Sequence, residues 1–286
     1  MITIKLRGGL GNQMFQYAFG RALADKLHTT LALDPHAYDL PTYALGNTPR
    51  TYKLNAFNIQ AQVITVEQAH TFNTVPRKII QKIQHILFRE NSWKFSPGYL
   101  CMRDGSYAIG YWQSEKYFAS VKDAIRKEFV LKQPFGPAAE KVLQEIKSKP
   151  ISVSLSIRRT DYLKDPTFKD VVCTQEYYLR ALDHIASTLN MDVSKLHVFI
   201  TTDDKAWADT LKLPCPYSFI SENDAQDYEW MMLIAQCSHH IIANSTFSWW
   251  GAWLNSKPNK IVVAPKNWAA LNIPTPDIIP ESWVTL

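Results

Sequence analysis

Apolar residues in the first part of the chain form short runs separated by a glycine turn and an amphipathic stretch. The mostly apolar stretch 2–6 leads into three glycines, and residues 12–27 then carry apolar side chains at helical spacing. A second, mostly apolar stretch, 29–33, ends at Asp34. Strand, tight turn, helix and strand in this order predict the opening of a Rossmann-like unit.

The same alternation restarts near residue 150. We expect strands at 151–157, 196–201, 240–243 and 260–264, and helices at 175–189, 205–211, 226–237 and 248–254. This alternation is typical of a parallel sheet covered on both faces. Prolines punctuate residues 131–150 around a polar helix, so we predict an α/β protein with domains 1–148 and 149–286.

Composition narrows the class of protein. The 286 residues are 46% apolar and 20% charged, as in soluble globular proteins. The net charge of +5 permits a phosphate-bearing ligand without requiring nucleic acid, and we expect no nucleic-acid partner. The four cysteines form no CxxC pair, and the chain shows no signal-peptide pattern and no apolar run long enough for a membrane span. We therefore expect a cytoplasmic protein with free thiols.

The glycine turn is the first candidate site. Gly8 and Gly9 precede a helix that begins near Asn12, and bare backbone amides at a helix N-terminus favour an anion. The dinucleotide fingerprint would need a third glycine at Met14. Asp34 lies close to where a ribose-binding carboxylate would stand, so a Rossmann oxidoreductase stays an alternative, as does a simple tight turn.

The second candidate site is the segment Ser156–Asp161, at the carboxyl end of the first strand of the second sheet. Ligands of open α/β sheets gather at this edge. Adjacent side chains at a strand end point in different directions, so Arg158 and Arg159 have different tasks. One is expected to grip a diphosphate and the other to pair with Asp161 or the scaffold, and a solvated charge cluster is the alternative.

The third candidate is a strand end that opens a helix at residues 243–254. Four side chains offer hydroxyl or amide groups to a phosphate: Asn244, Ser245, Thr246 and Ser248. The tryptophans that follow at helical spacing are expected in the core. No two aspartates are separated by one residue, so arginine and helix N-termini, and no metal, are expected to neutralise a diphosphate.

Together these motifs resemble the soluble bacterial α-1,2-fucosyltransferases of glycosyltransferase family 11. The matching blocks are residues 8–16, 110–114, 157–162, 177–178 and 243–254, in the family's order along the whole chain. The resemblance implies a GT-B-like pair of Rossmann-like domains with parallel sheets facing a cleft. It also implies GDP-L-fucose as donor substrate, inversion at the anomeric carbon, and no metal or other cofactor.

Site roles carry over from this resemblance position by position. Arg158 matches the first arginine of the HxRRxD motif, which neutralises the β-phosphate, and Asp203 matches an acidic strand end near the nucleoside. The expected donor-binding residues are Gly8, Gly9, Asn12, Ser156, Arg158, Asp203, Asn244, Ser245, Thr246 and Ser248. Ser156 stands in place of the motif's histidine, and Trp230 in place of a common aspartate.

The expected reaction is transfer of L-fucose from GDP-β-L-fucose to the 2-hydroxyl of a galactoside in a bacterial glycan, as in lipopolysaccharide or O-antigen biosynthesis. Asp161 is the first candidate for the general base, with Asp34 and Glu115 as alternatives. Trp112 and Gln113 are candidate acceptor contacts. A catalytically silent GDP-sugar-binding protein is the non-enzymatic alternative.

A basic amphipathic helix is expected at residues 77–89, with an isoleucine stripe among basic side chains. This pattern is found in helices that lie on anionic membranes, although packing of the stripe inside the protein is the favoured interpretation. Membrane association is therefore expected to be at most peripheral, at the inner membrane.

Overall fold

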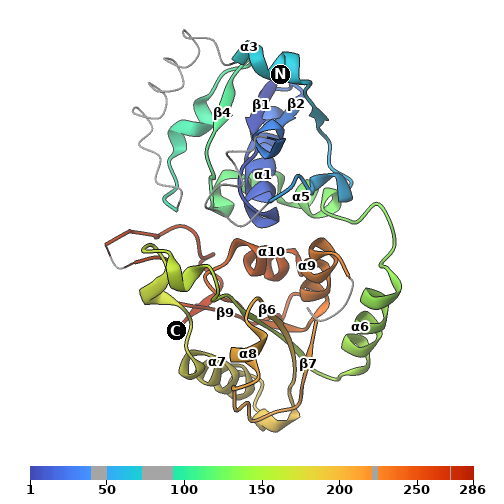
Figure 1. Cartoon of the computed structure of the whole chain (residues 1–286), viewed down its shortest axis with the longest axis vertical. Coiled ribbons are helices and arrows are strands. Elements are labelled where there is room, and N and C mark those ends of the chain that lie inside the picture. Colours follow the sequence, from blue (N-terminus) through green and yellow to red (C-terminus); the bar gives the residue numbers. More distant parts are fainter. Residues whose placement is uncertain (40–49, 73–92, 221–224, 271) are drawn as a thin grey trace. The chain divides into compact units, whose positions relative to one another are not determined.

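The computed structural model describes residues 1–39, 50–72, 93–220, 225–270 and 272–286 (Figure 1). They form two compact units, residues 1–132 with 276–280 and residues 133–275 with 281–286. The division falls at 132/133, whereas the sequence placed it at 148/149. The reason is that α6 (Pro137–Ser148) packs its apolar face against α9 (Asp227–Gln236) of the second unit.

The first unit is built on a parallel sheet with strand order β3-β2-β1-β4. Its strands are β1 (Ile2–Lys5), β2 (Leu31–Asp34), β3 (Gln62–Val63) and β4 (Tyr107–Ile109), and its helices are α1 (Leu10–Lys26), α3 (Val66–Phe72) and α5 (Lys122–Glu128). The predicted strand–helix–strand opening is confirmed by β1, α1 and β2. The short strands β3 and β4 were not predicted.

The second unit contains a six-stranded parallel sheet with strand order β10-β9-β8-β5-β6-β7. Its strands are β5 (Ser152–Ile157), β6 (His197–Thr202), β7 (Tyr217–Phe219), β8 (His239–Ile241), β9 (Val262–Ala264) and β10 (Val284–Thr285). Its other helices are α7 (Gln175–Thr188), α8 (Lys205–Ala208) and α10 (Thr246–Leu254). Every predicted strand is present, and β7 and β10 are additional.

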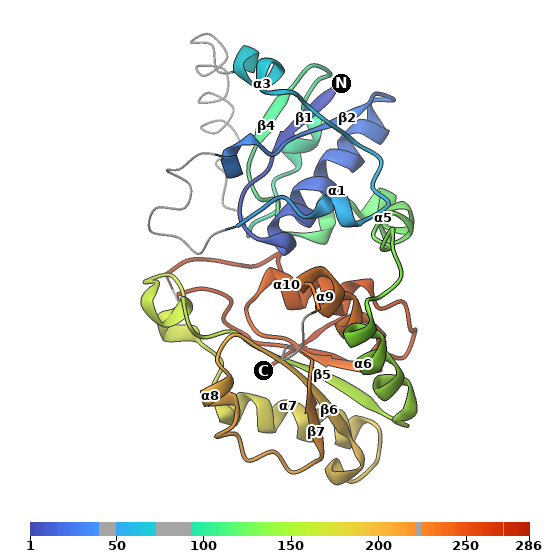
Figure 2. The same cartoon turned by 45° about the vertical axis from the view of Figure 1, so that its right-hand side comes forward.

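Helices cover both faces of this sheet, as Figures 1 and 2 show for α7 on one face and α9 with α10 on the other. Strand β6 alternates accordingly: Val198 and Ile200 pack into the cluster that contains α7, and Phe199 packs against α6 and α9. A Cβ on Gly251 would lie 2.4 Å from Cγ2 of Ile234, so α10 approaches α9 more closely than any side chain there would allow. Both units are therefore Rossmann-like α/β layers, as predicted.

Three tryptophans of α10 lie in the interior of the second unit. Trp249 and Trp250 are fully buried and Trp253 is 3% exposed. Their rings pack on one another, with Trp249 stacked on Trp253. The prediction that these residues belong to the core is confirmed.

Candidate functional site

Three strand ends of the second unit meet at one edge of its sheet. Strands β8, β5 and β6 are adjacent and parallel, so their carboxyl ends lie side by side. Residues 158–161 follow β5, Asp203 and Asp204 follow β6, and Asn244 follows β8 just before α10. The topology therefore brings together the second and third segments that the sequence singled out.

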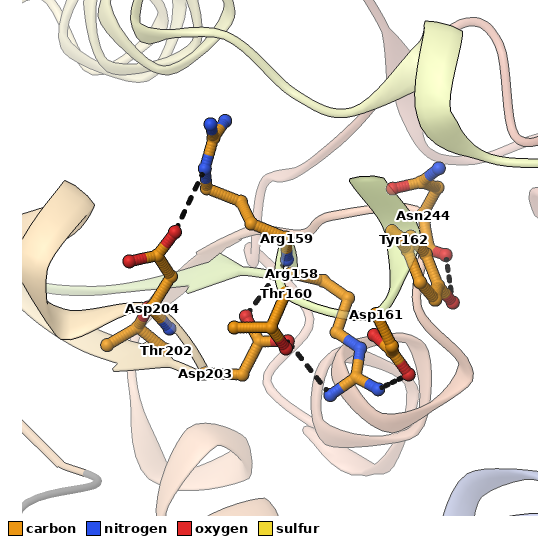
Figure 3. Close-up of polar contacts among 9 residues, drawn as sticks. All are labelled: Arg158, Arg159, Thr160, Asp161, Tyr162, Thr202, Asp203, Asp204 and Asn244. Carbon is orange, nitrogen blue, oxygen red and sulfur yellow. Dashed lines mark hydrogen bonds and ion pairs between the residues drawn. The ribbon is translucent and has the colours of Figure 1, made fainter. Parts of the chain in front are cut away.

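Arg158 lies at the centre of this edge, with its guanidinium between two carboxylates (Figure 3). Its Nη1 is 3.1 Å from Oδ2 of Asp203, and its Nη2 donates a hydrogen bond to Oδ2 of Asp161. The guanidinium also lies 5.3 Å from the centre of the Tyr162 ring. The side chain is 22% exposed, so this partly buried cation is fixed in direction and still reaches solvent.

Asp203 holds the whole turn that follows β5. Its Oδ1 accepts a hydrogen bond from the backbone N–H of Arg159 at 2.9 Å, and its Oδ2 accepts one from the Thr160 hydroxyl at 2.7 Å. The family resemblance implied a place near the nucleoside for Asp203, and in this structure its carboxylate is engaged by residues 158–160. Pairing of β5 with β6 creates these contacts, and no local signal in the sequence predicts them.

Arg159 points away from Arg158, which confirms the prediction that the two adjacent side chains point in different directions (Figure 3). Its guanidinium lies over the Trp207 ring, 4.1 Å from the ring centre, and its Nε is 3.5 Å from Oδ2 of Asp204. Asp204 also caps α8 by accepting a hydrogen bond from the N–H of Trp207 at 3.0 Å. Trp207 was not among the predicted site residues, although an aspartate three residues before it is a recognisable helix-cap signal.

The turn between β8 and α10 is held by two of the four residues predicted to bind phosphate. Asn244 is 1% exposed and donates from Nδ2 to the carbonyl of Trp268 at 3.1 Å. Ser248 is equally buried, and its hydroxyl donates to the carbonyl of Ser245 at 3.0 Å. These side chains therefore stabilise the turn, which differs from the phosphate contact predicted for them.

Ser245 and Thr246, the other two of these four residues, are half-buried at the N-terminus of α10. Ser245 is the N-cap residue, and its side chain makes no capping hydrogen bond to the first turn. The Tyr162 hydroxyl donates to the carbonyl of Asn244 at 3.1 Å, so the ring beside Arg158 also anchors this turn. A cation and a helix N-terminus are thus connected through one tyrosine.

Ser156 takes no part in this exposed edge. It is 5% exposed, and its hydroxyl lies 3.0 Å from the hydroxyl of Thr201 on the neighbouring strand. The predicted donor contact through this side chain is therefore corrected to a hydrogen bond inside the sheet.

The glycine loop of the first unit has the geometry of a tight turn into a helix. Gly8 has φ +77°, a conformation that favours glycine, and Gly9 is the N-cap residue of α1. The Tyr38 hydroxyl donates to the Gly8 carbonyl at 2.9 Å. Arg50 lies beside the loop, 3.7 Å from where a Cβ of Gly9 would stand. This cation at a helix N-terminus suits an anion and was not predicted.

Two neighbouring candidates for acceptor binding are buried in the first unit. Trp112 is 1% exposed and stacks on Phe19 at a centroid distance of 4.1 Å, with a backbone φ of +46°. Gln113 is 6% exposed, and its Nε2 donates to Oδ1 of Asn12 at 2.7 Å. Trp112 therefore belongs to the core, which corrects the prediction, and Gln113 orients Asn12 in the first turn of α1.

Asp34 is also a core residue. It is 3% exposed, and its carboxylate accepts hydrogen bonds from the Tyr107 hydroxyl and, at 3.0 Å, from the backbone N–H of His36. Burial and this carboxylate raise the pKa of Tyr107. The Asp34 carboxylate, on which the oxidoreductase alternative rested, is therefore buried and hydrogen-bonded inside the first unit.

Several further expectations concern absences or lie outside the described residues. The predicted basic helix at 77–89 falls within residues 73–92, which the structure does not describe. Within the described ranges, no helix is long and apolar enough to cross a membrane, and no three His, Cys, Asp or Glu side chains gather as a metal site.

All four cysteines are free, and burial raises the pKa of Cys173 and of Cys237 to about 12.

Sequence similarity to a known family and to individual known proteins extends along the whole chain. The model of "Glycosyl transferase family 11" matches residues 1–286. An α-1,2-colitosyltransferase of Escherichia coli is 31% identical over 299 residues, covering 100% of this chain and 99% of that protein. The O-antigen biosynthesis glycosyltransferase WbnK of Escherichia coli is 30% identical over 309 residues, covering 98% of this chain and 99% of that protein.

Among solved structures, the NodZ α-1,6-fucosyltransferase of Bradyrhizobium, in a crystal soaked with GDP-fucose, superposes with a TM-score of 0.53. It is 16% identical, and the superposition covers 88% of this chain and 92% of that one, so the likeness supports the GT-B-like fold. The match over residues 1–286 and the relatives that span the full chain establish that this protein belongs to glycosyltransferase family 11.

Proposed function

We propose that this glycosyltransferase moves L-fucose from GDP-β-L-fucose to the 2-hydroxyl of a galactoside, forming an α-1,2 linkage with inversion. The observation that carries the proposal is the placement of Arg158 at the carboxyl edge of the second sheet, connected through Tyr162 to the N-terminus of α10. Both groups favour negative charge, which is what a leaving diphosphate develops.

In the proposed reaction, the acceptor hydroxyl oxygen forms a bond to the anomeric carbon while the bond from that carbon to the β-phosphate oxygen breaks. The electron pair stays on the diphosphate, where Arg158 and the α10 N-terminus stabilise it. The hydroxyl proton passes to a carboxylate. Asp161 is the proposed base because it is 37% exposed and lies beside Arg158.

No metal is needed in this proposal, because arginine and helix amides supply the positive charge. The acceptor is proposed to be a galactose-containing glycan of a bacterial surface polysaccharide. The relative WbnK, named for O-antigen biosynthesis, supports this class. We place the protein in the cytoplasm, with at most peripheral contact to the inner membrane.

Colitose is the second candidate for the transferred sugar. A relative that is 31% identical along the whole chain is named an α-1,2-colitosyltransferase. Colitose differs from fucose only in lacking the 3-hydroxyl, so the same diphosphate contacts serve either donor.

The test supplies GDP-fucose or GDP-colitose together with lactose or N-acetyllactosamine, and measures free GDP and the product linkage by NMR. We expect GDP release that depends on acceptor and an α-1,2-linked product. Binding of GDP without any product, with all donor–acceptor pairs, would instead favour the catalytically silent binding protein. A product with a different linkage would refute the proposed acceptor hydroxyl.

A further inference from the structure

The two carboxylates that hold Arg158 are not equivalent (Figure 3). Asp203 is 19% exposed and interacts with three consecutive residues, the side chain of Arg158, the backbone of Arg159 and the hydroxyl of Thr160. Asp161 is 37% exposed and comes from the same turn as Arg158, three residues further along. Removing Asp203 would break contacts with three successive residues, whereas Asp161 shares the turn of Arg158, so a local change in that turn separates its carboxylate from the guanidinium.

Charge balance favours the departure of one carboxylate when a diphosphate arrives. One guanidinium between two carboxylates carries a formal surplus of negative charge, which repels a further anion. A phosphate also needs N–H donors of the guanidinium, and each terminal nitrogen of Arg158 already has one carboxylate oxygen beside it, so a phosphate at Nη2 meets the carboxylate of Asp161. Arg159 is engaged separately with Asp204 and Trp207, and does not relieve this surplus at Arg158.

We infer that Asp161 is a placeholder for the donor, occupying on Nη2 of Arg158 the position that the β-phosphate takes. Asp203 is then a positioning residue that keeps the guanidinium in place during this exchange. The inference rests on the proposed function and adds to it the order in which the donor binds and the base becomes available. Because the donor displaces Asp161, its carboxylate becomes available to accept the acceptor's proton only after the donor is bound.

Isothermal titration calorimetry with GDP and with GMP tests this exchange, because the two probes differ by the β-phosphate. The variants are Asp161→Asn and Asp203→Asn. Asp170→Asn, which removes an exposed carboxylate from the same loop, is the matched control. Thermal unfolding confirms that each variant is folded.

We expect Asp161→Asn to bind GDP roughly two- to fivefold more tightly than the wild type, with GMP affinity unchanged, because a competing partly exposed ion pair is lost. Asp203→Asn is expected to weaken GDP binding by about tenfold, since the guanidinium is no longer held. Asp170→Asn should match the wild type. If Asp203→Asn does not fold, the Asp161→Asn titration alone carries the test.

Unchanged or weaker GDP binding by Asp161→Asn overturns the inference. Equal tightening of GMP also overturns it, because the effect would not then arise at the β-phosphate. A wild-type protein that binds neither GDP nor GDP-fucose would refute the proposed function itself. If the wild type binds GDP and Asp161→Asn binds it with the same affinity, only the inference about Asp161 fails.

Discussion

Replacing Arg158 by lysine is the most direct test of how this site stabilises a leaving diphosphate. The arginine uses Nη1 toward Asp203 and Nη2 toward Asp161, two directions that one planar guanidinium satisfies at once. A lysine ammonium is a single point charge on a flexible chain and cannot hold one carboxylate while presenting a fork to phosphate oxygens. Charge is conserved in this variant, so the change isolates geometry.

The expected loss follows from the role of a fixed donor in an electrostatic site. Removing one such donor costs about 3–4 kcal/mol of transition-state stabilisation, which corresponds to roughly 10²–10³ in kcat. The cost in folding free energy is expected to be smaller, about 1 kcal/mol, because the Arg158 side chain is 22% exposed and its ion pairs are partly solvated.

Arg159→Lys is the matched control, since it makes the same substitution one residue away. Its guanidinium packs on Trp207 and pairs with Asp204, so we expect a loss of about 1 kcal/mol in stability. We expect its kcat to fall far less than that of Arg158→Lys. Initial rates of GDP release and urea unfolding curves separate the two effects. Wild-type activity in a folded Arg158→Lys protein would refute the assignment of Arg158 to the diphosphate.

Three further outcomes are expected. Activity should survive EDTA, because arginine and helix amides supply the counter-charge; a reversible requirement for Mg²⁺ or Mn²⁺ in the GDP-release assay would contradict this. Burial lowers the pKa of His240 well below 6.5, and its ring lies between Ser154 at 2.8 Å and Asn255 at 2.7 Å. As the pH falls, this histidine is protonated in the unfolded chain before it is protonated in the folded protein. The free energy of unfolding should therefore keep its full value above about pH 6.5 and fall by up to ~1.4 kcal/mol per pH unit below it. Urea unfolding of wild type and His240→Gln between pH 7.5 and 5.5 checks this, and an equal slope in both proteins would disprove it. Gly251→Ala should destabilise the second unit by about 1–3 kcal/mol, because its Cβ would meet Ile234 at 2.4 Å; an unchanged urea midpoint would show that α10 can shift.

Local sequence pattern was sufficient for the main elements of both units. Apolar runs and helical spacing predicted β1, α1 and β2, and the alternation after residue 150 predicted β5, β6, β8 and β9 with their helices. The helices show helical spacing, and the short strands β8 and β9 overlap the apolar runs 241–243 and 261–264, so the signal is visible in one stretch of chain. Strands β3, β7 and β10 span two or three residues each, contain polar residues and form by pairing with a neighbour, so no apolar run marks them in the sequence.

The sequence also located the candidate site, because the carboxyl ends of parallel strands share one edge of a sheet. It predicted that Arg158 and Arg159 diverge, since neighbouring side chains in extended backbone point in different directions. It did not predict which partners they meet. Asp203 and Trp207 reach the two arginines only because β6 lies beside β5, a contact between residues more than 40 positions apart.

Burial was the property that only the tertiary structure decided. A serine, asparagine or tryptophan in a motif has the same chemistry whether it faces solvent or a neighbouring strand. Packing of α10 and of the first unit's core made Asn244, Ser248 and Trp112 structural residues, and strand pairing did the same for Ser156. The sequence by itself determined the order of elements and the edge where ligand chemistry gathers. Only the folded chain determined which of those side chains are left to touch a ligand, because exposure depends on contacts between segments that are distant in sequence.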